Sequence, residues 1–481
     1  MKRRRNIELE TQKHRCKVTE GAVKVLSNDV KWEYSAPSIP NSHWIEQGHG
    51  ELYAEGLLVY ELFLRQMKNM TCAMRDGVGV YAEEYGKCGR NFTLGIRDLR
   101  YGRHRHPIII HDKLMIPHWK ELADAIGLHR GFNGYGVLTI CNTQLHHMVM
   151  DMLVTAFKGK RFEELRLDMN DFGSPHDGIT FAIRMTQNIS WLQRFLWANT
   201  SINTSEDAHR LIESIAEHET IETIRLRNCC QGDMNGYDLL CLLLELYTRI
   251  EIDSLDENFL RTVDLGMNCI RTMGQTHLPD FLATNPPLSE LHLEHNKLDD
   301  KDALLIASAL KQNTHLTHLF LEGNDFTEVG RQSLCDAVFD STSLNAAASS
   351  NHTCFVGEVK GQSIGIRYGL FDGHRFSIDN DPHDQSLNRG TKIYSMLLSR
   401  NEEGSNAQHL DVEFGDDSIK VAPKVLEAVH SLHSLHLRKL GRWVRRKRHR
   451  LPTSLSITFE ILRDWLVTEL CECNQRKSST S

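Results

Sequence analysis

Residues 288–326, LSELHLEHNKLDDKDALLIASALKQNTHLTHLFLEGNDF, contain one pattern twice. The first copy consists of Leu288, Leu291, Leu293, Asn296 and Leu298, and 28 residues later the second consists of Leu316, Leu319, Leu321, Asn324 and Phe326. Apolar residues at alternate positions predict a short strand with one buried face. The asparagine that follows predicts a tight turn directly after the strand.

The same pattern continues towards the N-terminus. Leu260, Val263, Leu265, Asn268 and Ile270 repeat it 28 residues earlier, and looser copies occupy residues 221–229, 192–200, 162–170 and 135–143. A fainter copy contains Ile108 and Ile110. The polar positions are separated by 27, 30, 29, 39, 28 and 28 residues in chain order. Residues 344–354, LNAAASSNHTC, are predicted to end the array because alanine and serine replace leucine.

The segments between the predicted strands have a helical pattern. Residues 207–219, 237–247, 302–313 and 330–339 carry apolar side chains at i, i+3, i+4 and i+7. The 39-residue step predicts an insertion at residues 245–258. No single strand and helix can bury its leucines alone, so the copies must stack. The expected fold class is α/β, a curved solenoid with parallel strands inside and helices outside.

The pattern LxxLxLxxNxL resembles the leucine-rich repeat, and its 28-residue step resembles the ribonuclease-inhibitor-like class. The closing segment, followed by RGTKIYSMLLSRN (389–401) and SLSITFEILRDW (454–465), resembles a family of uncharacterised algal leucine-rich-repeat proteins. That second resemblance implies no activity. The first implies a surface that binds other proteins.

Three regions are expected along the chain. Residues 1–104 form an N-terminal cap region with a partly disordered start, and residues 105–355 form a solenoid of about seven to eight repeats plus a terminal cap. Residues 356–481 form a C-terminal loop and helical region that contains a basic cluster at 438–450.

The repeat asparagines have a predicted structural role. Their amides can hydrogen-bond to the backbone of their own coil and of the adjacent one, which satisfies polar groups that stacking buries. The four residues assigned this role are Asn170, Asn268, Asn296 and Asn324. Thr200 and Cys229 occupy the same position in two other coils, and we expect looser coils there.

Residues that alternate with the buried leucines are expected to line the concave face. The candidate partner-binding residues there are Arg166, Arg194, Arg225, Arg227, Asp264, Glu290, His292, Glu294, His318, Phe320 and Glu322. The four arginines form a basic zone, and Phe320 is surrounded by histidines and glutamates, as an interface anchor with a charged rim would be. These residues also fit two other interpretations, an ordinary solvated sheet face and a metal site at His292, His318 and the glutamates.

The expected function is a non-enzymatic scaffold that holds a partner protein on the concave face. No phosphate-binding loop, nucleophile elbow or zinc-protease motif occurs in the sequence, and no catalytic residue, cofactor or metal is assigned. One alternative is a regulator of a small GTPase, because Ran GTPase-activating proteins are similar to this repeat class and use an arginine, a role open to Arg166, Arg194 or Arg225. A nuclear or ubiquitin-pathway adaptor is another, and its ligase form would need Cys471 or Cys473.

Net charge and hydropathy favour a cytoplasmic or nuclear location. The formal net charge of −7 makes nucleic acid an unlikely partner, and no window is apolar enough for a membrane span. Arg445, Arg446, Lys447 and Arg448 are a candidate nuclear-localisation signal. The identity of the partner protein and the oligomeric state do not follow from the sequence.

Overall fold

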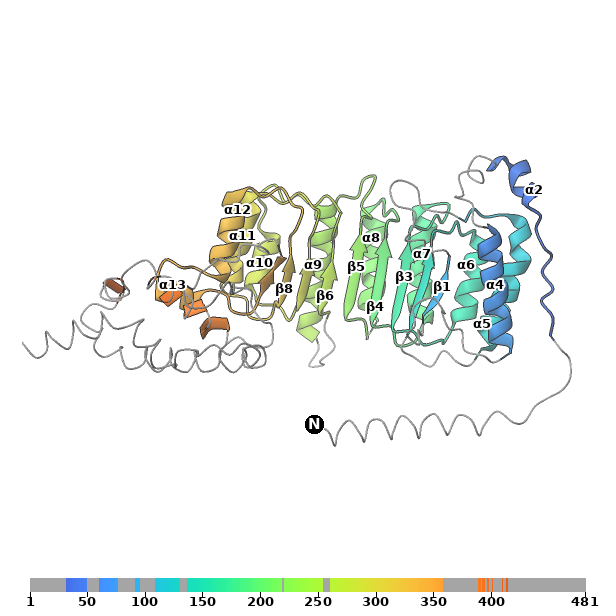
Figure 1. The fold of residues 1–481 in the computed structure, drawn as a ribbon, viewed down its shortest axis with the longest axis horizontal. Coiled ribbons are helices and arrows are strands. Elements are labelled where there is room, and N and C mark those ends of the chain that lie inside the picture. The colour runs from blue at the N-terminus through green and yellow to red at the C-terminus, as the bar shows by residue number, and fades with distance from the viewer. Residues whose placement is uncertain are drawn as a thin grey trace, which may run out of the picture.

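The computed structural model describes residues 32–49, 60–76, 91–95, 109–129, 136–218, 220–253, 260–357 and eleven positions between 388 and 413. In this part of the chain nine strands form one parallel sheet, and each strand lies between its neighbours in sequence (Figure 1). The strands are β1 (Phe92–Leu94), β2 (Val137–Cys141), β3 (Glu164–Asp168), β4 (Arg194–Ala198), β5 (Thr223–Arg227), β6 (Thr262–Asp264), β7 (Glu290–His292), β8 (His318–Phe320) and β9 (Phe355–Val356).

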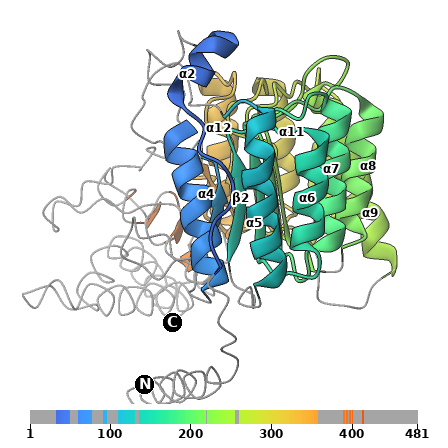
Figure 2. The same cartoon turned by 90° about the vertical axis from the view of Figure 1, so that its right-hand side faces the viewer.

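Helices alternate with these strands and lie on one side of the sheet. In Figure 2 helices α5 to α9 lie side by side as an outer layer. The main helices are α4 (Tyr60–Arg75), α5 (Ile116–Leu128), α6 (His147–Phe157), α7 (Pro175–Asn188), α8 (Ser205–Ala216), α9 (Gly236–Asp253), α10 (His277–Ala283), α11 (Asp300–Leu310) and α12 (Glu328–Val338). Shorter elements are α2 (Asn41–Trp44), η1 (Ile45–His49), η3 (Lys113–Met115) and α13 (Leu344–Ser349). This arrangement confirms the predicted α/β solenoid.

The repeat leucines share one interior. Leu265, Leu293 and Leu321 follow strands β6, β7 and β8, and all three are fully buried in the same core cluster. The strand register places Val263, Leu291 and Leu319 directly beside one another as a second buried row. Stacking buries the leucines of neighbouring coils against each other, which stabilises the array through the hydrophobic effect.

Short polar residues start the helices. Ser174 precedes Pro175, the first residue of α7, and its hydroxyl accepts a hydrogen bond from the backbone of Asp177. Asp299 and Asp302 form a reciprocal capping box at the start of α11. Such caps satisfy backbone N–H groups that have no partner within the helix. They also fix where each coil turns from strand to helix.

The repeat asparagines join adjacent coils, as predicted. Asn296 is fully buried, and its amide nitrogen donates to the carbonyls of Leu265 (3.1 Å) and Leu293 (3.0 Å). Its amide oxygen accepts from the backbone nitrogens of Asn268 and Ile270, both at 3.0 Å. Asn170, Asn268 and Asn324 likewise bond to the backbone of the preceding coil.

The hydrogen bonds of the repeat asparagines form a ladder that runs from coil to coil. Thr200 and Cys229 occupy the asparagine position in two coils and continue this ladder with fewer side-chain hydrogen bonds. The Thr200 hydroxyl accepts from the backbone of Asn170 at 3.2 Å and donates to the carbonyl of Ala198 at 3.1 Å. Cys229 is fully buried, and its backbone nitrogen donates to the Asn268 amide oxygen at 2.9 Å. Both coils therefore keep the same turn without an asparagine.

The residue before each ladder position has a left-handed backbone. Asn142, Asn199 and Asn228 adopt positive φ angles there, as do Met169, Met267 and His295. Gly323, at φ 74°, fills the same place in the last of these turns. Asparagine and glycine tolerate this conformation, whereas methionine and histidine do so at a cost. The sequence pattern did not reveal this second requirement of the turn.

The array differs from the sequence prediction at three places. The neighbour of β2 is β1, whereas Ile109 of the predicted faint copy makes only a single bridge to Thr143. Much of the expected insertion at 245–258 is an extension of α9, which runs to Asp253. The predicted end of the array contains one more strand, because Phe355 and Val356 of β9 pair with β8. Strand pairing between distant residues decides the first and the last of these points.

Both ends of the array are covered. At the N-terminal side Trp44 stacks on Tyr60 of α4 with ring centroids 3.5 Å apart, and α4 packs on α5. At the C-terminal side the buried Lys392 donates to the carbonyls of Val338 and Asn351. The described positions between 388 and 400 are helical, and one of them, Asn388, donates to the carbonyl of His352 at 2.8 Å. No helix in the ranges given above is both long and apolar enough to pass through a bilayer.

Candidate protein-interaction surface

The strand register brings the predicted concave-face residues together in rows. One row runs through Arg166, Leu196, Arg225, Asp264, His292 and Phe320, and the row beside it runs through Glu164, Arg194, Thr223, Thr262, Glu290 and His318. These rows agree with the order expected from the repeat. Neighbouring strands are about 4.8 Å apart, so side chains next to each other in a row are in contact range.

The basic zone is largely neutralised by carboxylates. Arg166 and Arg194 both pair with Glu164, whose side chain is 3% exposed, and Arg194 also pairs with Glu163 at 2.6 Å. Burial would raise the pKa of Glu164, but the hydrogen bonds and charges of the two arginines outweigh it and lower the pKa. The charges of Arg166 and Arg194 at this end of the face are therefore balanced by Glu163 and Glu164.

Arg225 differs from these two arginines. It lies between Leu196 and Asp264 in the strand register and is half-buried. The parts of the chain that the structure describes provide no ion pair or hydrogen bond for its guanidinium, since Asp264 pairs with Arg227. Its charge is available to a ligand or partner.

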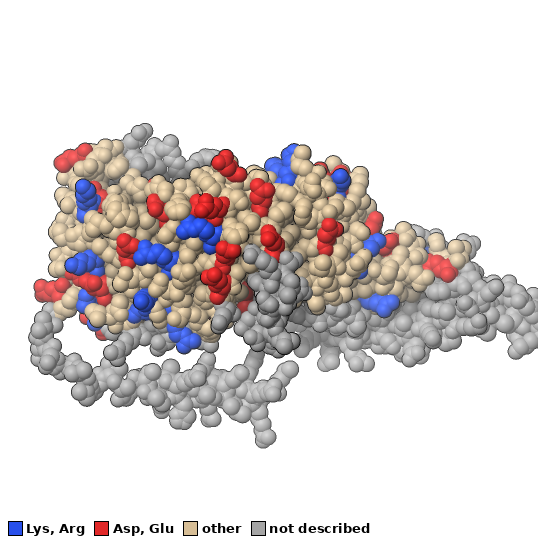
Figure 3. All heavy atoms as spheres, turned by 180° about the vertical axis from the view of Figure 1, so that it is seen from behind, with Lys and Arg blue, Asp and Glu red and all other residues tan. Residues whose placement is uncertain are grey.

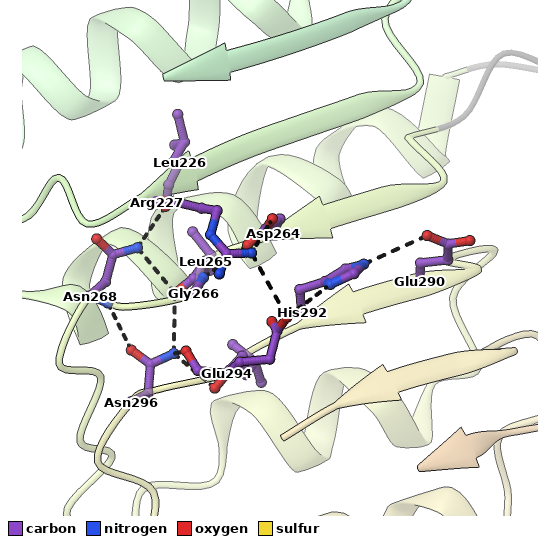
Figure 4. Close-up of polar contacts among 11 residues, drawn as sticks. Leu226, Arg227, Asp264, Leu265, Gly266, Asn268, Glu290, His292, Glu294 and Asn296 are labelled. Atoms are coloured by element: carbon purple, nitrogen blue, oxygen red, sulfur yellow. Dashed lines mark hydrogen bonds and ion pairs between the residues drawn. The ribbon is translucent and has the colours of Figure 1, made fainter. Parts of the chain in front are cut away.

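A chain of charged contacts crosses strands β5 to β7 (Figure 4). Arg227 lies 2.9 Å from the Asp264 carboxylate and 3.8 Å from that of Glu294. His292 Nδ1 lies 3.4 Å from Glu294, and its Nε2 lies 3.6 Å from Glu290. These contacts hold five side chains of the face in fixed positions relative to one another.

The carboxylates shift the protonation of His292. Burial lowers the pKa of His292, but the hydrogen bond to Glu294 and the charges of Asp264 and Glu294 outweigh it, so the pKa is raised. Burial raises the pKa of Glu294, but His292 and Arg227 lower it more, so the net change is downwards. The charged forms of both groups are thus favoured in the folded protein.

Aromatic rings stack beside this network. The rings of His292 and Phe320 have centroids 4.3 Å apart and an angle of 23° between their planes. His318 lies 5.9 Å from Phe320 with nearly parallel rings, and Phe355 lies 6.2 Å from Phe320 and 6.1 Å from His318. Phe320 is half-buried, so the four rings form an aromatic strip that reaches the surface.

Glu322 is the acidic residue at the end of the strip. One of its carboxylate oxygens is buried and accepts no hydrogen bond from the residues that the structure describes, and the same holds for one oxygen of Glu294. A side chain at Gly357 would collide with the Glu322 carboxylate, so a glycine backbone closes one side of it. Glu322 therefore retains capacity for a cationic partner.

Other predicted sites have different outcomes. Within the described ranges no group of three or more histidine, cysteine, aspartate or glutamate residues has the arrangement of a metal site, His292 and His318 included. The candidate localisation signal at Arg445, Arg446, Lys447 and Arg448 and the thiols of Cys471 and Cys473 lie outside the described residues.

Sequence reasoning missed two residues of this surface. Phe355 joins the aromatic strip through β9, and Glu163 pairs with Arg194 from the position before β3. Asn351 lies three residues before Cys354, just as Asn313 lies three residues before Leu316 in the preceding copy. This shared spacing was a signal in the sequence for β9. Both asparagines accept backbone hydrogen bonds at the start of the next strand.

The side opposite to the view of Figure 1 has a different surface. Figure 3 shows acidic and basic side chains interspersed over it among uncharged residues. Mixed charges of this kind are ordinary for a solvated protein surface. The strip of rings bordered by carboxylates is therefore the more distinctive candidate for recognition.

The coils repeat one strand and one helix, and asparagine hydrogen bonds join each coil to the next. With the helices on one side of the sheet, this arrangement is that of a leucine-rich-repeat solenoid. The sequence model described as Leucine Rich repeat matches residues 284–307 and 312–335, which contain strands β7 and β8. Repeats of this kind are commonly protein-interaction modules and generally non-enzymatic. No curated protein matches the chain.

Proposed function

We propose that the protein is a non-enzymatic scaffold that holds a partner protein on its concave strand face. The observation that carries the proposal is the half-buried Phe320, stacked on His292 and bordered by Glu290, Glu294 and Glu322. An aromatic anchor surrounded by polar residues is typical of the centre of a protein interface. The network from Arg227 to Glu290 supports this role, because a prearranged surface loses less entropy on binding.

The class of leucine-rich repeat, the family and the cellular location of the protein are also proposals. The strand–helix coil and the 28-residue step support assignment to the ribonuclease-inhibitor-like class of leucine-rich repeats. The closing segment and the residues after it support the resemblance to the algal family. A location in the cytoplasm or nucleus accords with this class and is tested by imaging the tagged chain with and without residues 442–450.

The GTPase-regulator alternative depends on an arginine that can reach a nucleotide. Arg166 and Arg194 are bound to Glu164, which disfavours them for this role. Arg225 is the candidate that the contacts favour, since the described residues leave its guanidinium unpaired. A stabilising arginine of this kind accelerates GTP hydrolysis by about 10³–10⁵-fold, so the alternative has a large measurable effect.

A site-specific cross-linking experiment tests the scaffold proposal. A photoreactive phenylalanine analogue replaces Phe320 in the full chain, and a matched variant carries it at Leu304 on α11, where the side chain is 51% exposed. We expect a partner to be trapped at position 320 and not at 304. The identified protein is then purified and titrated against the wild type and Phe320→Ala, with at least tenfold weaker binding expected for the variant. Equal binding to both would refute the proposed surface.

A further inference from the structure

The charges around Phe320 are unbalanced. Asp264, Glu290, Glu294 and Glu322 supply four carboxylates on or just after strands β6, β7 and β8. Arg227 and a protonated His292 offset two of these charges, and Arg225, which lies opposite Asp264 on β5, offsets a third. His318 lies 4.0 Å from Glu290, a weak contact that requires its protonation. This part of the face is therefore net acidic although the adjoining part with Arg166 and Arg194 is neutralised.

Two of the carboxylates lack full hydrogen bonding. One oxygen of Glu294 and one of Glu322 are buried and accept no hydrogen bond from the described part of the chain. A buried polar atom without a hydrogen bond raises the free energy of the protein that contains it. A cation beside Glu322 would stabilise this arrangement. Glu290 has a side chain that is 40% exposed and offers a second carboxylate at the surface.

The rings between these carboxylates also favour a cation. Phe320 and His318 are parallel within 8°, and Phe320 lies next to Phe355. Aromatic faces attract ammonium and guanidinium groups, and arginine in particular stacks on such rings while it pairs with carboxylates. An acidic partner segment would instead meet like charges from Glu290 and Glu322.

We infer that the partner presents a basic segment, whose arginine or lysine side chains pair with Glu290 and Glu322 and lie against the ring of Phe320. This inference rests on the proposed function and adds the chemistry of the partner. Pairing with charges at the rim of a surface increases the association rate and makes it dependent on salt. Binding is thus expected to weaken as the ionic strength rises.

A peptide selection tests the chemistry of the partner. A display library of random dodecapeptides is selected on the immobilised full chain and counter-selected on Glu290→Gln/Glu322→Gln. We expect enrichment of arginine and lysine, with the best peptide binding the double variant about threefold to tenfold more weakly than the wild type. Glu206→Gln on α8 leaves the affinity unchanged and serves as the charge-matched control for the single variant Glu290→Gln. Glu290→Gln alone provides a second variant if the double variant unfolds.

Specific outcomes would overturn the inference. Selection of neutral or acidic peptides, or no enrichment at all, contradicts a basic partner segment. Stronger binding of a synthetic peptide with residues 438–450 than of any selected peptide would identify the chain's own basic cluster as the occupant. A partner trapped at position 320 that docks through a neutral segment refutes the inference and leaves the proposed function intact. Trapping at position 304 instead of 320 refutes the proposed function itself.

Discussion

His292 lies face to face with Phe320, the two ring centroids being 4.3 Å apart, although 27 residues separate them in the sequence. The contact exists because β7 and β8 pair in parallel with His292 directly opposite Phe320. Glu290 and Glu294 flank His292 on the same strand and in the turn after it. A titratable ring is therefore part of the surface that we assign to partner binding.

The first prediction concerns the pH dependence of stability at His292. Its pKa is raised above the usual histidine value, mainly because Glu294 and Asp264 outweigh burial. Stabilisation by the charged ring is fully present below about pH 6.5 and is lost as the pH rises through the raised pKa. Urea unfolding at pH 6 and pH 9 should show a smaller decrease in stability for His292→Gln than for the wild type. An equal decrease in both proteins contradicts the assignment.

The second prediction concerns the asparagine ladder. Asn296→Ala removes three donated hydrogen bonds, one of them a long one of 3.5 Å, and two accepted ones from a fully buried position. We expect a loss of about 2–5 kcal/mol in the free energy of unfolding, because buried backbone groups lose their partners. Asn324→Ala is the matched comparison at a half-buried position and should cost less. Chemical denaturation followed by circular dichroism measures both, and a larger effect at Asn324 would conflict with this account.

The third prediction concerns the left-handed turn residues. Met267 has a φ angle of 65°, so its backbone is strained. Because 44% of its surface is exposed, replacing its side chain removes little buried packing. Met267→Asn should stabilise the protein by about 0.5–1 kcal/mol, because asparagine tolerates this conformation better. The midpoint of thermal unfolding provides the measurement. Asn142→Met, the reverse change in an equivalent turn, should lower the midpoint, and the opposite pair of shifts would disprove the explanation.

The fourth prediction concerns the C-terminal segment that covers the last coil. Burial and the charges of Lys392 and Arg389 lower the pKa of His352 to about 4. A neutral His352 therefore contributes stability above about pH 6.5 that is lost as the pH falls towards 4. Hydrogen exchange at residues 388–400 should accelerate over this range in the wild type and change less in His352→Gln. Exchange that is independent of pH after correction for the intrinsic rate would rule out this role for His352.

The fifth prediction distinguishes the scaffold from a GTPase regulator. Neither the wild type nor Arg225→Ala is expected to accelerate GTP hydrolysis by a panel of purified small GTPases. Acceleration of 10³-fold or more that depends on Arg225 would instead favour the regulator. Arg166→Ala is the comparison variant, because Arg166 is already paired with Glu164.

The sequence by itself determined the repeat and, with it, most of the fold. Leucines at fixed spacing can be buried only if successive coils stack, so the spacing was sufficient to predict the strand rows and the neighbours of His292 and Phe320. The asparagines were identifiable because four of the seven copies place one at the same distance after the strand. A repeated spacing predicts both features because it places equivalent residues at equivalent positions in successive coils.

Tertiary structure alone decided how the charges are distributed and where the sheet ends. Glu164 neutralises two arginines of neighbouring strands, and Glu163 adds a contact from outside the strand pattern. The first and last strands, β1 and β9, pair with the array although their sequences lack the full LxxLxLxxNxL pattern. Ion pairs and edge-strand pairing depend on distances between coils, and residue spacing along the chain does not fix those distances.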